Sequence, residues 1–424
     1  MRFLLSTCIA LSLTTAASAQ NAPAAADSSD PVREMVGRLD LEQYKATIKG
    51  LTQFGDRMQG TKRNADAVDW IEAQLKSYGC TNTERIRYEY SPPAPRGGGA
   101  GRRAGGAGTD PAGRAGRAGG GGRAAGAAST GIISGSGGSR IRGNRARTGV
   151  NRDSLAQPDP RLRALNAEQA PTTPGMREEV YCTKVGTTRP DEMYIVGAHM
   201  DGHGWGEAAN DDGSGTAIVM QLARVFSSPD VQTDRSIRFA LWNNEETGLN
   251  GARAYIAQRQ ALQGKEDPAG SGRYPEPKWL GMIQHDMMLF DHGMPRADGT
   301  INPEQRPEAD VNIEFQINSR MADQSMKLAF VLHQANRNYA TDYPATVGPH
   351  MTNTDSGPFQ DIIPAVSLRE NERGAHIGAG WDPHWHQPTD LYATFSDKDF
   401  RLGLNAAQTT LAALGQLTGA RLRK

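Results

Sequence analysis

The 424-residue chain has few aromatic residues, few cysteines and no net charge. Phe, Trp and Tyr make up 6% of it, three residues are cysteine, and 47 basic residues balance 47 acidic ones. A net charge of zero argues against a polybasic nucleic-acid-binding protein and against an acidic disordered chain. The sequence also lacks an apolar run of the roughly 18 residues that a transmembrane helix needs. Its length suits one large α/β domain or two smaller ones.

The zero net charge is the sum of two unequal parts. Residues 96–149 contain 20 Gly, 10 Arg and one acid, Asp110, so this stretch carries +9 and the rest of the chain carries −9. Such a stretch has too few apolar side chains to offset its ordering entropy. We therefore predict a disordered insert over 93–175, Gly/Ala/Arg-rich and then Pro-rich, within a single domain formed by residues 20–92 and 176–424.

Arg-Gly-rich tracts can bind RNA through their charge. The insert lacks interleaved aromatic residues, however, which favours a solvated surface loop. We expect no specific nucleic-acid partner.

The first 19 residues have the pattern of a signal peptide. Arg2 precedes an apolar run over 3–13, and Ala17-Ser18-Ala19 forms a cleavage site of the A-x-A type. The alternative is a retained N-terminal anchor. The pattern predicts export to a bacterial periplasm or to the medium, with no transmembrane segment in the rest of the chain.

Two cysteines remain once Cys8 leaves with the signal peptide. Cys80 and Cys182 each lie in or beside a strand-like run, and an even pair in an oxidising compartment is a candidate disulfide. If the two strands are neighbours, the bridge closes the base of the insert. Two buried free thiols are the alternative.

Strand and helix patterns alternate over most of the chain. This alternation predicts an α/β fold of three layers, with a mixed, mainly parallel central sheet between helices. Short apolar runs predict the strands and amphipathic or buried patterns predict the helices. The strands are expected over 85–90, 179–182, 193–198, 236–242, 279–284 and 363–368, and the helices within 31–79 and over 213–226, 248–260, 321–338 and 397–417.

Polar residues gather where several of these strands end. Ligand sites in open α/β sheets lie at the carboxyl ends of strands, and buried carboxylates are costly together unless a cation joins them. Histidine mixed with carboxylate favours zinc, and two His with three carboxylates can hold two ions when one carboxylate is shared. The clusters lie at 199–201, 210–215, 243–248, 285–286 and 384–390.

As an ordered set, these clusters resemble the motifs of the M28 family of zinc-dependent exopeptidases, the bacterial leucyl-aminopeptidase type. Gly197-Ala198-His199-Met200-Asp201 resembles the first ligand motif, which implies that His199 binds zinc and that Asp201 orients it. Asn210-Asp211-Asp212-Gly213 resembles the motif whose aspartate bridges two metals, which implies this role for Asp211. In that family a cis peptide often follows the bridging aspartate.

The remaining motifs complete the set implied by the resemblance. In Glu245-Glu246-Thr247-Gly248 the first Glu corresponds to the general base and the second to a zinc ligand. His285-Asp286 resembles the strand-end ligand motif, so Asp286 is the expected ligand. The closing motif, 386–390, implies His386 as a ligand and Asp390 as its conformational partner.

The resemblance therefore implies a secreted enzyme with two Zn²⁺ ions that removes N-terminal residues from peptides. Glu245 would accept a proton from a metal-bridging water and return it to the leaving amine. Three alternatives remain: a carboxypeptidase or dipeptidase of the same family, a glutaminyl-cyclase-like acyltransferase with one zinc, and a metal-stabilised binding module without turnover.

The sequence departs from the family pattern in two places. The family often has Ser-Asp-His before Pro-Phe, whereas Ser356 stands at the His position here, and Trp385 stands where some relatives have an oxyanion-stabilising Tyr. Asp355 is a candidate for lining the site, with a turn or cap role as the alternative. His384 competes with His386, and the spacing to Asp390 favours His386. The other histidines, at positions 203, 285, 292, 333, 350 and 376, are expected to be structural or exposed.

Overall fold

The computed structural model describes residues 30–92, 150–169, 173–290, 292–295, 301–305, 311–349, 353–370 and 382–423. The predicted signal peptide and residues 93–149 of the predicted insert lie outside these ranges. The elements below belong to one unit, Pro31–Lys424. Within the described ranges, no helix combines the length and the apolar composition that crossing a bilayer requires.

The helices begin and end at residues that satisfy their terminal backbone groups. The Asp40 side chain accepts from the Gln43 amide at the start of α2, and Ser396 and Asp399 form a capping box at the start of α8. The helices are α1 (Pro31–Val36), α2 (Leu41–Thr52), α3 (Lys62–Ser77), α4 (Pro160–Leu165), α5 (Gly213–Phe226), α6 (Asn250–Arg259), α7 (Ala322–Tyr339) and α8 (Asp397–Thr418), with 3-10 turns η1 (Ser154–Ala156), η2 (Gln260–Leu262), η3 (Gly357–Phe359) and η4 (Tyr392–Thr394).

The central sheet has eight strands in the order β1-β2-β5-β3-β6-β11-β9-β10. Strands β5, β3, β6 and β11 are parallel to one another, as are β9 and β10, whereas β1, β2 and β5 pair antiparallel and so do β11 and β9. The sheet is therefore mixed and mainly parallel, as predicted. Its strands are β1 (Glu84–Tyr90), β2 (Gly175–Lys184), β3 (Arg189–His199), β5 (Arg235–Trp242), β6 (Lys278–His285), β9 (Val311–Phe315), β10 (Ala345–Gly348) and β11 (Ala365–Arg369).

Two short pairs lie outside this sheet. They are β4 (Val231–Gln232) with β12 (Arg421–Leu422), and β7 (His292–Pro295) with β8 (Ile301–Gln305).

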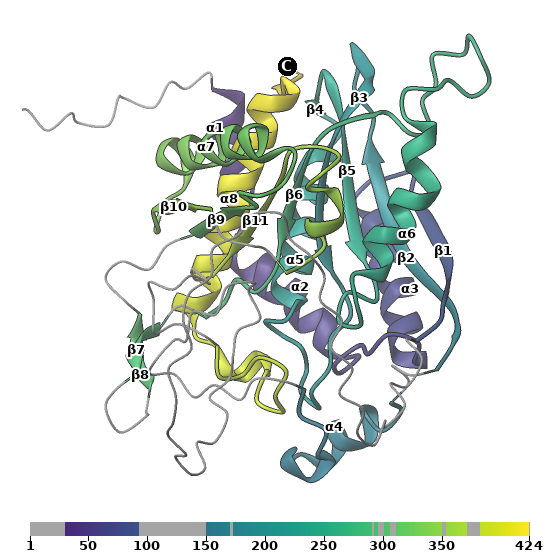
Figure 1. Ribbon diagram of the computed structural model, residues 1–424. Helices are drawn as coiled ribbons and strands as arrows, with labels where there is room; N and C mark the ends of the chain where they lie inside the picture. The colour runs from purple at the N-terminus through teal and green to yellow at the C-terminus, as the bar shows by residue number, and fades with distance from the viewer. Residues whose placement is uncertain are drawn as a thin grey trace, which may run out of the picture. The chain divides into compact units, whose positions relative to one another are not determined.

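Side chains that alternate along the strands supply two separate cores. Val196 and Phe239 face the larger core, which contains residues of α1, α2, α3, α5, α7 and α8. Ile195 and Ala240 face the smaller core, which contains residues of α6 and η3. Helices therefore cover both faces of the sheet, with α6 and α8 on opposite sides of it (Figure 1). This is the predicted three-layer arrangement.

The prediction of disorder is wrong for the C-terminal part of the insert. Residues 150–169 form η1 and α4, and Gln157 and Asn166 are buried there although this stretch is poor in apolar residues. Hydrogen bonds take the place of apolar packing here. The Asn166 side-chain amide donates to the Gly206 carbonyl at 2.8 Å, and its side-chain oxygen accepts from the Asp56 backbone amide at 3.1 Å. Polar composition alone therefore misplaced the end of the disordered insert.

Cys80 and Cys182 form a disulfide with their Cα atoms 6.1 Å apart. Cys182 lies on β2 and Cys80 precedes β1, and these two strands are antiparallel neighbours. The bond spans 102 residues of sequence, including the Gly/Arg-rich stretch, so it ties together the two ends of that long connection.

Removing the disulfide is expected to lower the free energy of unfolding by about 2–5 kcal/mol, because the unfolded chain gains freedom when so long a loop opens. The Cys80→Ala/Cys182→Ala double variant tests this by urea denaturation with and without reductant. Reductant should lower the midpoint of the wild type toward that of the variant and leave the variant unchanged. A wild-type denaturation midpoint that is the same with and without reductant would indicate two free thiols instead.

Candidate metal centre

Parallel strands deliver the predicted ligands to one edge of the sheet. His199 is the last residue of β3 and pairs with Trp242, the last residue of β5. Glu245 and Glu246 follow β5, and Asp286 follows β6, the other parallel neighbour of β3. Because these strands run in the same direction, their carboxyl ends place these side chains together.

Asp211 lies at the centre of this group, just before α5. Its Oδ1 is 3.3 Å from His199 Nε2, and its Oδ2 is 3.0 Å from His386 Nε2. The Asp211–Asp212 peptide is cis. One buried carboxylate thus faces an imidazole with each of its two oxygens, which is the geometry a bridging ligand requires.

One group of possible ligands surrounds His199. His199, Glu245 and Asp286 each offer an atom within 4.8 Å of the others. Asp286 Oδ1 is 3.9 Å from His199 Nε2, and Asp286 Oδ2 accepts from the buried guanidinium of Arg369 at 2.8 Å. Arg369 therefore fixes one oxygen of Asp286 and leaves the other facing His199.

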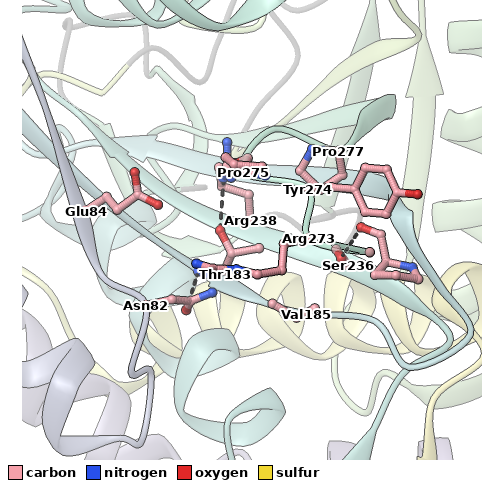
Figure 2. A pocket seen from close by; sticks show the side chains of 12 residues that line it. Asn82, Glu84, Thr183, Val185, Ser236, Arg238, Arg273, Tyr274, Pro275 and Pro277 are labelled. Atoms are coloured by element: carbon pink, nitrogen blue, oxygen red, sulfur yellow. Dashed lines mark hydrogen bonds between the residues drawn. The ribbon is translucent and has the colours of Figure 1, made fainter. Parts of the chain in front are cut away.

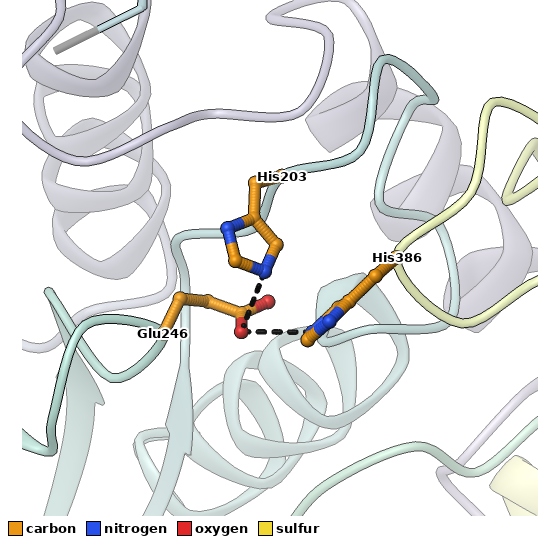
Figure 3. Close-up of side chains that lie close together, drawn as sticks. All are labelled: His203, Glu246 and His386. Carbon is orange, nitrogen blue, oxygen red and sulfur yellow. Dashed lines mark ion pairs between the residues drawn. The ribbon is translucent and has the colours of Figure 1, made fainter. Parts of the chain in front are cut away.

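A second group lies on the other side of Asp211. Glu246 Oε2 is 2.8 Å from His386 Nε2 and 3.0 Å from His203 Nε2, and Figure 3 shows both rings pointing at this carboxylate. His203 is 8% exposed, so the alternative of an exposed residue is wrong, and its ring lies in the centre against Glu246. The spacing His199-x-Asp201-x-His203 could have indicated this, because alternate residues of an extended segment share a face.

Asp201 and Asp390 position other residues of the centre. The Asp201 backbone carbonyl is 2.9 Å from His199 Nδ1, whereas its Oδ1 is 3.9 Å from that nitrogen and accepts from the Glu245 amide at 3.1 Å. Asp390 accepts from the Asn210 amide at 2.8 Å and from the Asp211 amide at 3.1 Å. Asp201 therefore orients His199 with its backbone and the backbone of Glu245 with its side chain.

The buried Arg57 organises the loop that follows β3. Its guanidinium donates to the carbonyls of Met200 at 2.8 Å, Glu207 at 2.8 Å and Ala208 at 2.7 Å. A side chain that donates to three carbonyls fixes the course of this loop, which carries His203. Nothing in the sequence pattern singled out Arg57 or Arg369, because their partners are distant in the chain.

Several loops of the centre are held in left-handed backbone conformations. Trp205, Asn244, Met287 and His386 have φ values of 70°, 64°, 62° and 57°. Each such residue other than glycine costs about 1–3 kcal/mol, and such strain is typical of functional sites.

The ordered end of the insert ties two of these loops together. The Gln157 side-chain amide donates to the Trp205 carbonyl at 2.8 Å and to the Pro388 carbonyl at 2.9 Å. The Asn151 backbone amide donates to the His386 backbone carbonyl at 3.0 Å. Residues 150–169 thereby fix the spacing between the loops that carry His203 and His386.

The electrostatics of the centre fit a cation. Burial opposes ionisation of Asp211, yet the imidazoles of His199 and His386 outweigh it and hold its pKa well below the usual value. Burial likewise raises the pKa of Glu246, but His203 and His386 bring it down to about 2. Asp211 Oδ2 and the Nε2 atoms of His203 and His386 are buried, and each lies 2.8–3.0 Å from an imidazole nitrogen or a carboxylate oxygen of this group. Imidazole nitrogens and carboxylate oxygens that converge in this way are the ligand types that zinc prefers.

The structure separates these residues from the remaining candidates. His285 is buried, and its Nε2 lies 2.9 Å from Thr410 Oγ1. His384 Nδ1 lies 2.8 Å from Thr389 Oγ1, and its ring packs edge-on against Phe290. Asp355 is fully buried, and its charge helps to raise the pKa of Glu245.

A separate pocket lies at the opposite ends of the same strands (Figure 2). Arg238 is buried in its wall and donates to Thr183 Oγ1 at 3.0 Å and to the Pro275 carbonyl at 3.1 Å, and it forms an ion pair with Glu276. This guanidinium is already engaged by the protein, and the amino ends of parallel strands are not where open α/β sheets bind substrates.

The model of Peptidase family M28 matches residues 179–409, more than half of the chain, and the chain belongs to this family. It is 36% identical over 74 residues to leupeptin-inactivating enzyme 1 of Streptomyces exfoliatus, covering 18% of this chain and 17% of that protein. It is 42% identical over 67 residues to aminopeptidase YwaD of Bacillus subtilis, covering 16% and 14%. The chain thus matches less than a fifth of the length of either relative.

Solved structures share the fold over most of the chain. BSAP, a zinc aminopeptidase from Bacillus subtilis, aligns with a TM-score of 0.55 at 13% identity, covering 89% of this chain and 95% of that one. A glutaminyl cyclase from Porphyromonas gingivalis aligns with a TM-score of 0.51 at 13% identity, covering 90% and 99%. At this identity the likeness shows the fold alone.

The Asp390→Asn substitution is expected to weaken zinc binding by about 10–100-fold, the usual effect of losing a partner behind a ligand. Asp390 accepts from the Asn210 and Asp211 backbone amides with its two separate oxygens. The substituted side chain has only one oxygen, so it cannot accept both hydrogen bonds in this way. Zinc affinity measured by competition with a chromophoric chelator tests this, with Asp66→Asn on the exposed side of α3 as the matched control. Equal affinity in the two variants would show that Asp390 does not support Asp211.

Proposed function

We propose that the chain is an exported di-zinc aminopeptidase. The observation that carries this is the position of Asp211, whose two oxygens lie 3.3 Å from His199 and 3.0 Å from His386. His199, Asp211 and Asp286 would hold one ion, and Asp211, Glu246 and His386 the other. Zinc ions held there would supply Lewis acidity and lower the pKa of a bound water molecule.

Glu245 is the proposed general base. Burial raises its pKa well above the usual value, and the charges of Glu246, Asp355 and Asp286 add to this effect against the opposing charge of His199. A carboxylate with a raised pKa accepts a proton more readily near neutral pH. Glu245 would take the proton of the attacking water at its carboxylate and deliver it to the leaving amine, which breaks the peptide bond.

Two acids of the centre that are not proposed metal ligands favour a substrate amine over a substrate carboxylate. A carboxypeptidase needs a cationic group for the terminal carboxylate of its substrate. Among the described residues, the fully buried arginines next to the ligands are Arg57, which donates to backbone carbonyls, and Arg369, which donates to Asp286 through Nη2. The buried acids Glu245 and Asp355 would instead attract a free α-amine.

Export is part of the proposal and rests on two features. Residues 1–19 have the pattern of a signal peptide. The Cys80–Cys182 disulfide suits an oxidising compartment such as the periplasm or the medium.

Replacing Glu245 with Gln is expected to lower kcat by about 10²–10⁴-fold, because the amide cannot accept the proton, while zinc content stays unchanged. Hydrolysis of a chromogenic aminoacyl amide and metal analysis of the same samples test this. The exposed Glu89→Gln on β1 is the matched control. A Glu245→Gln variant with wild-type turnover would rule out Glu245 as the base.

Blocking the substrate's amino group is expected to abolish hydrolysis, because an N-acetyl group removes the positive charge that the acidic site attracts. The test compares free and N-acetylated peptides with free and amidated C-termini. An aminopeptidase requires the free N-terminus and tolerates the amide. Cleavage that instead requires the free C-terminus would establish a carboxypeptidase, and cyclisation of N-terminal glutamine without hydrolysis would establish a glutaminyl cyclase.

A further inference from the structure

His203 and His386 approach the same carboxylate oxygen from two loops. Their Nε2 atoms lie 3.0 Å and 2.8 Å from Glu246 Oε2, and the two rings cross at 88° with centroids 4.2 Å apart. Both histidine residues are 8% exposed. Figure 3 shows the three side chains converging, with the two ring nitrogens aimed at Glu246.

The converging atoms form a set of possible metal ligands. The buried Nε2 atoms of both histidines contact one oxygen of Glu246, and His386 Nε2 also lies 3.0 Å from Asp211 Oδ2, whereas the buried Glu246 Oε1 has no hydrogen-bond partner among the described residues. Two imidazoles that crowd one carboxylate oxygen, beside a second oxygen left unpaired, point to a binding partner that the protein itself does not supply. That partner must accept lone pairs from nitrogen and from carboxylate oxygen, which is the chemistry of a divalent metal ion.

We propose that His203 is a fourth protein ligand of the ion held by Asp211, Glu246 and His386. This inference rests on the proposed function, because it presupposes an ion on that side of Asp211. Four ligands complete the tetrahedral shell of a closed zinc site, whereas a catalytic zinc has three protein ligands and an open position. The ion beside His199, Asp211 and Asp286 would therefore be the one that keeps a position for water or substrate.

The backbone holds His203 in this position. Gly204 has a φ of 103°, and a Cβ at this residue would lie 2.4 Å from the carbonyl carbon of His386. Only glycine permits so close an approach, and it places His203 directly against the His386 loop. Gln157 bonds to both loops, to Trp205 at 2.8 Å and to Pro388 at 2.9 Å, and so fixes the distance between them.

The test titrates Zn²⁺ into the metal-free full chain in competition with a chromophoric chelator. The variants are His203→Ala, His203→Gln and, as the matched control, His384→Ala. Glutamine can still donate a hydrogen bond to Glu246 but is a poor zinc ligand. The wild type should bind two ions, and both His203 variants should lose about 100-fold or more in affinity at one site only, beyond what loss of a supporting hydrogen bond usually costs. The control should match the wild type.

Two results would overturn the assignment. Wild-type affinity in both His203 variants would make the residue a bystander, and loss in His203→Ala with full affinity in His203→Gln would make it a hydrogen-bond donor to Glu246. Circular dichroism verifies folding, and His203→Gln decides the question if His203→Ala does not fold.

If the wild type binds only one ion, the proposed two-ion function is contradicted, whatever the role of His203. In that case His203 is still a ligand if His203→Gln lowers the affinity for the single ion by about 100-fold or more. The assignment fails if the affinity does not fall by that much.

Discussion

Asp211 is buried between two imidazoles and among further carboxylates, and the electrostatic cost of this arrangement constrains the rest of the structure. Removing several charges from water costs several kcal/mol for each ion unless opposite charges and good geometry offset it. Burial opposes ionisation of Asp211, and protonated imidazoles of His199 and His386 offset that cost and hold the pKa of its carboxyl well below the usual value. Divalent cations bound by the same nitrogens and oxygens would supply the positive charge in place of those protons.

Side chains from other parts of the fold hold the loops of this centre in place through hydrogen bonds to their backbone groups. Parallel strands deliver His199 and Asp286 to one edge, but the loops between them are polar and in part left-handed, so they do not hold their shape alone. Arg57 and Asp390 bond to their backbone groups. Gln157 adds a further tie from a segment that follows the Gly/Arg-rich stretch. Ligand geometry in this protein is therefore set by residues that do not themselves bind metal.

The sequence predicted those parts of the structure whose signals are local or ordered along the chain. Apolar periodicity located β3, β5, β6 and the long helices, because burial on both faces leaves a strong pattern. It missed β9 and β10, which are only five and four residues long. The ligand motifs were readable because each follows a strand or precedes a helix.

What the sequence did not reveal depends on contacts between distant segments. Arg57 and Arg369 carry no motif, and their roles follow only from the carbonyls and the carboxylate that the fold brings to them. His203 was placed among the structural histidines because its partner, Glu246, lies 43 residues away. Residues 150–169 are ordered through hydrogen bonds to the site, which a composition-based argument for disorder does not take into account.

Anomalous diffraction at the zinc edge, from crystals of the zinc-loaded protein, can reveal whether Asp211 joins two metal ions. We expect two peaks about 3.5–4 Å apart, one on each side of the Asp211 carboxylate. One peak should lie against His199 and Asp286, and the other against Glu246 and His386. A single peak, or a pair that does not share Asp211, would contradict it.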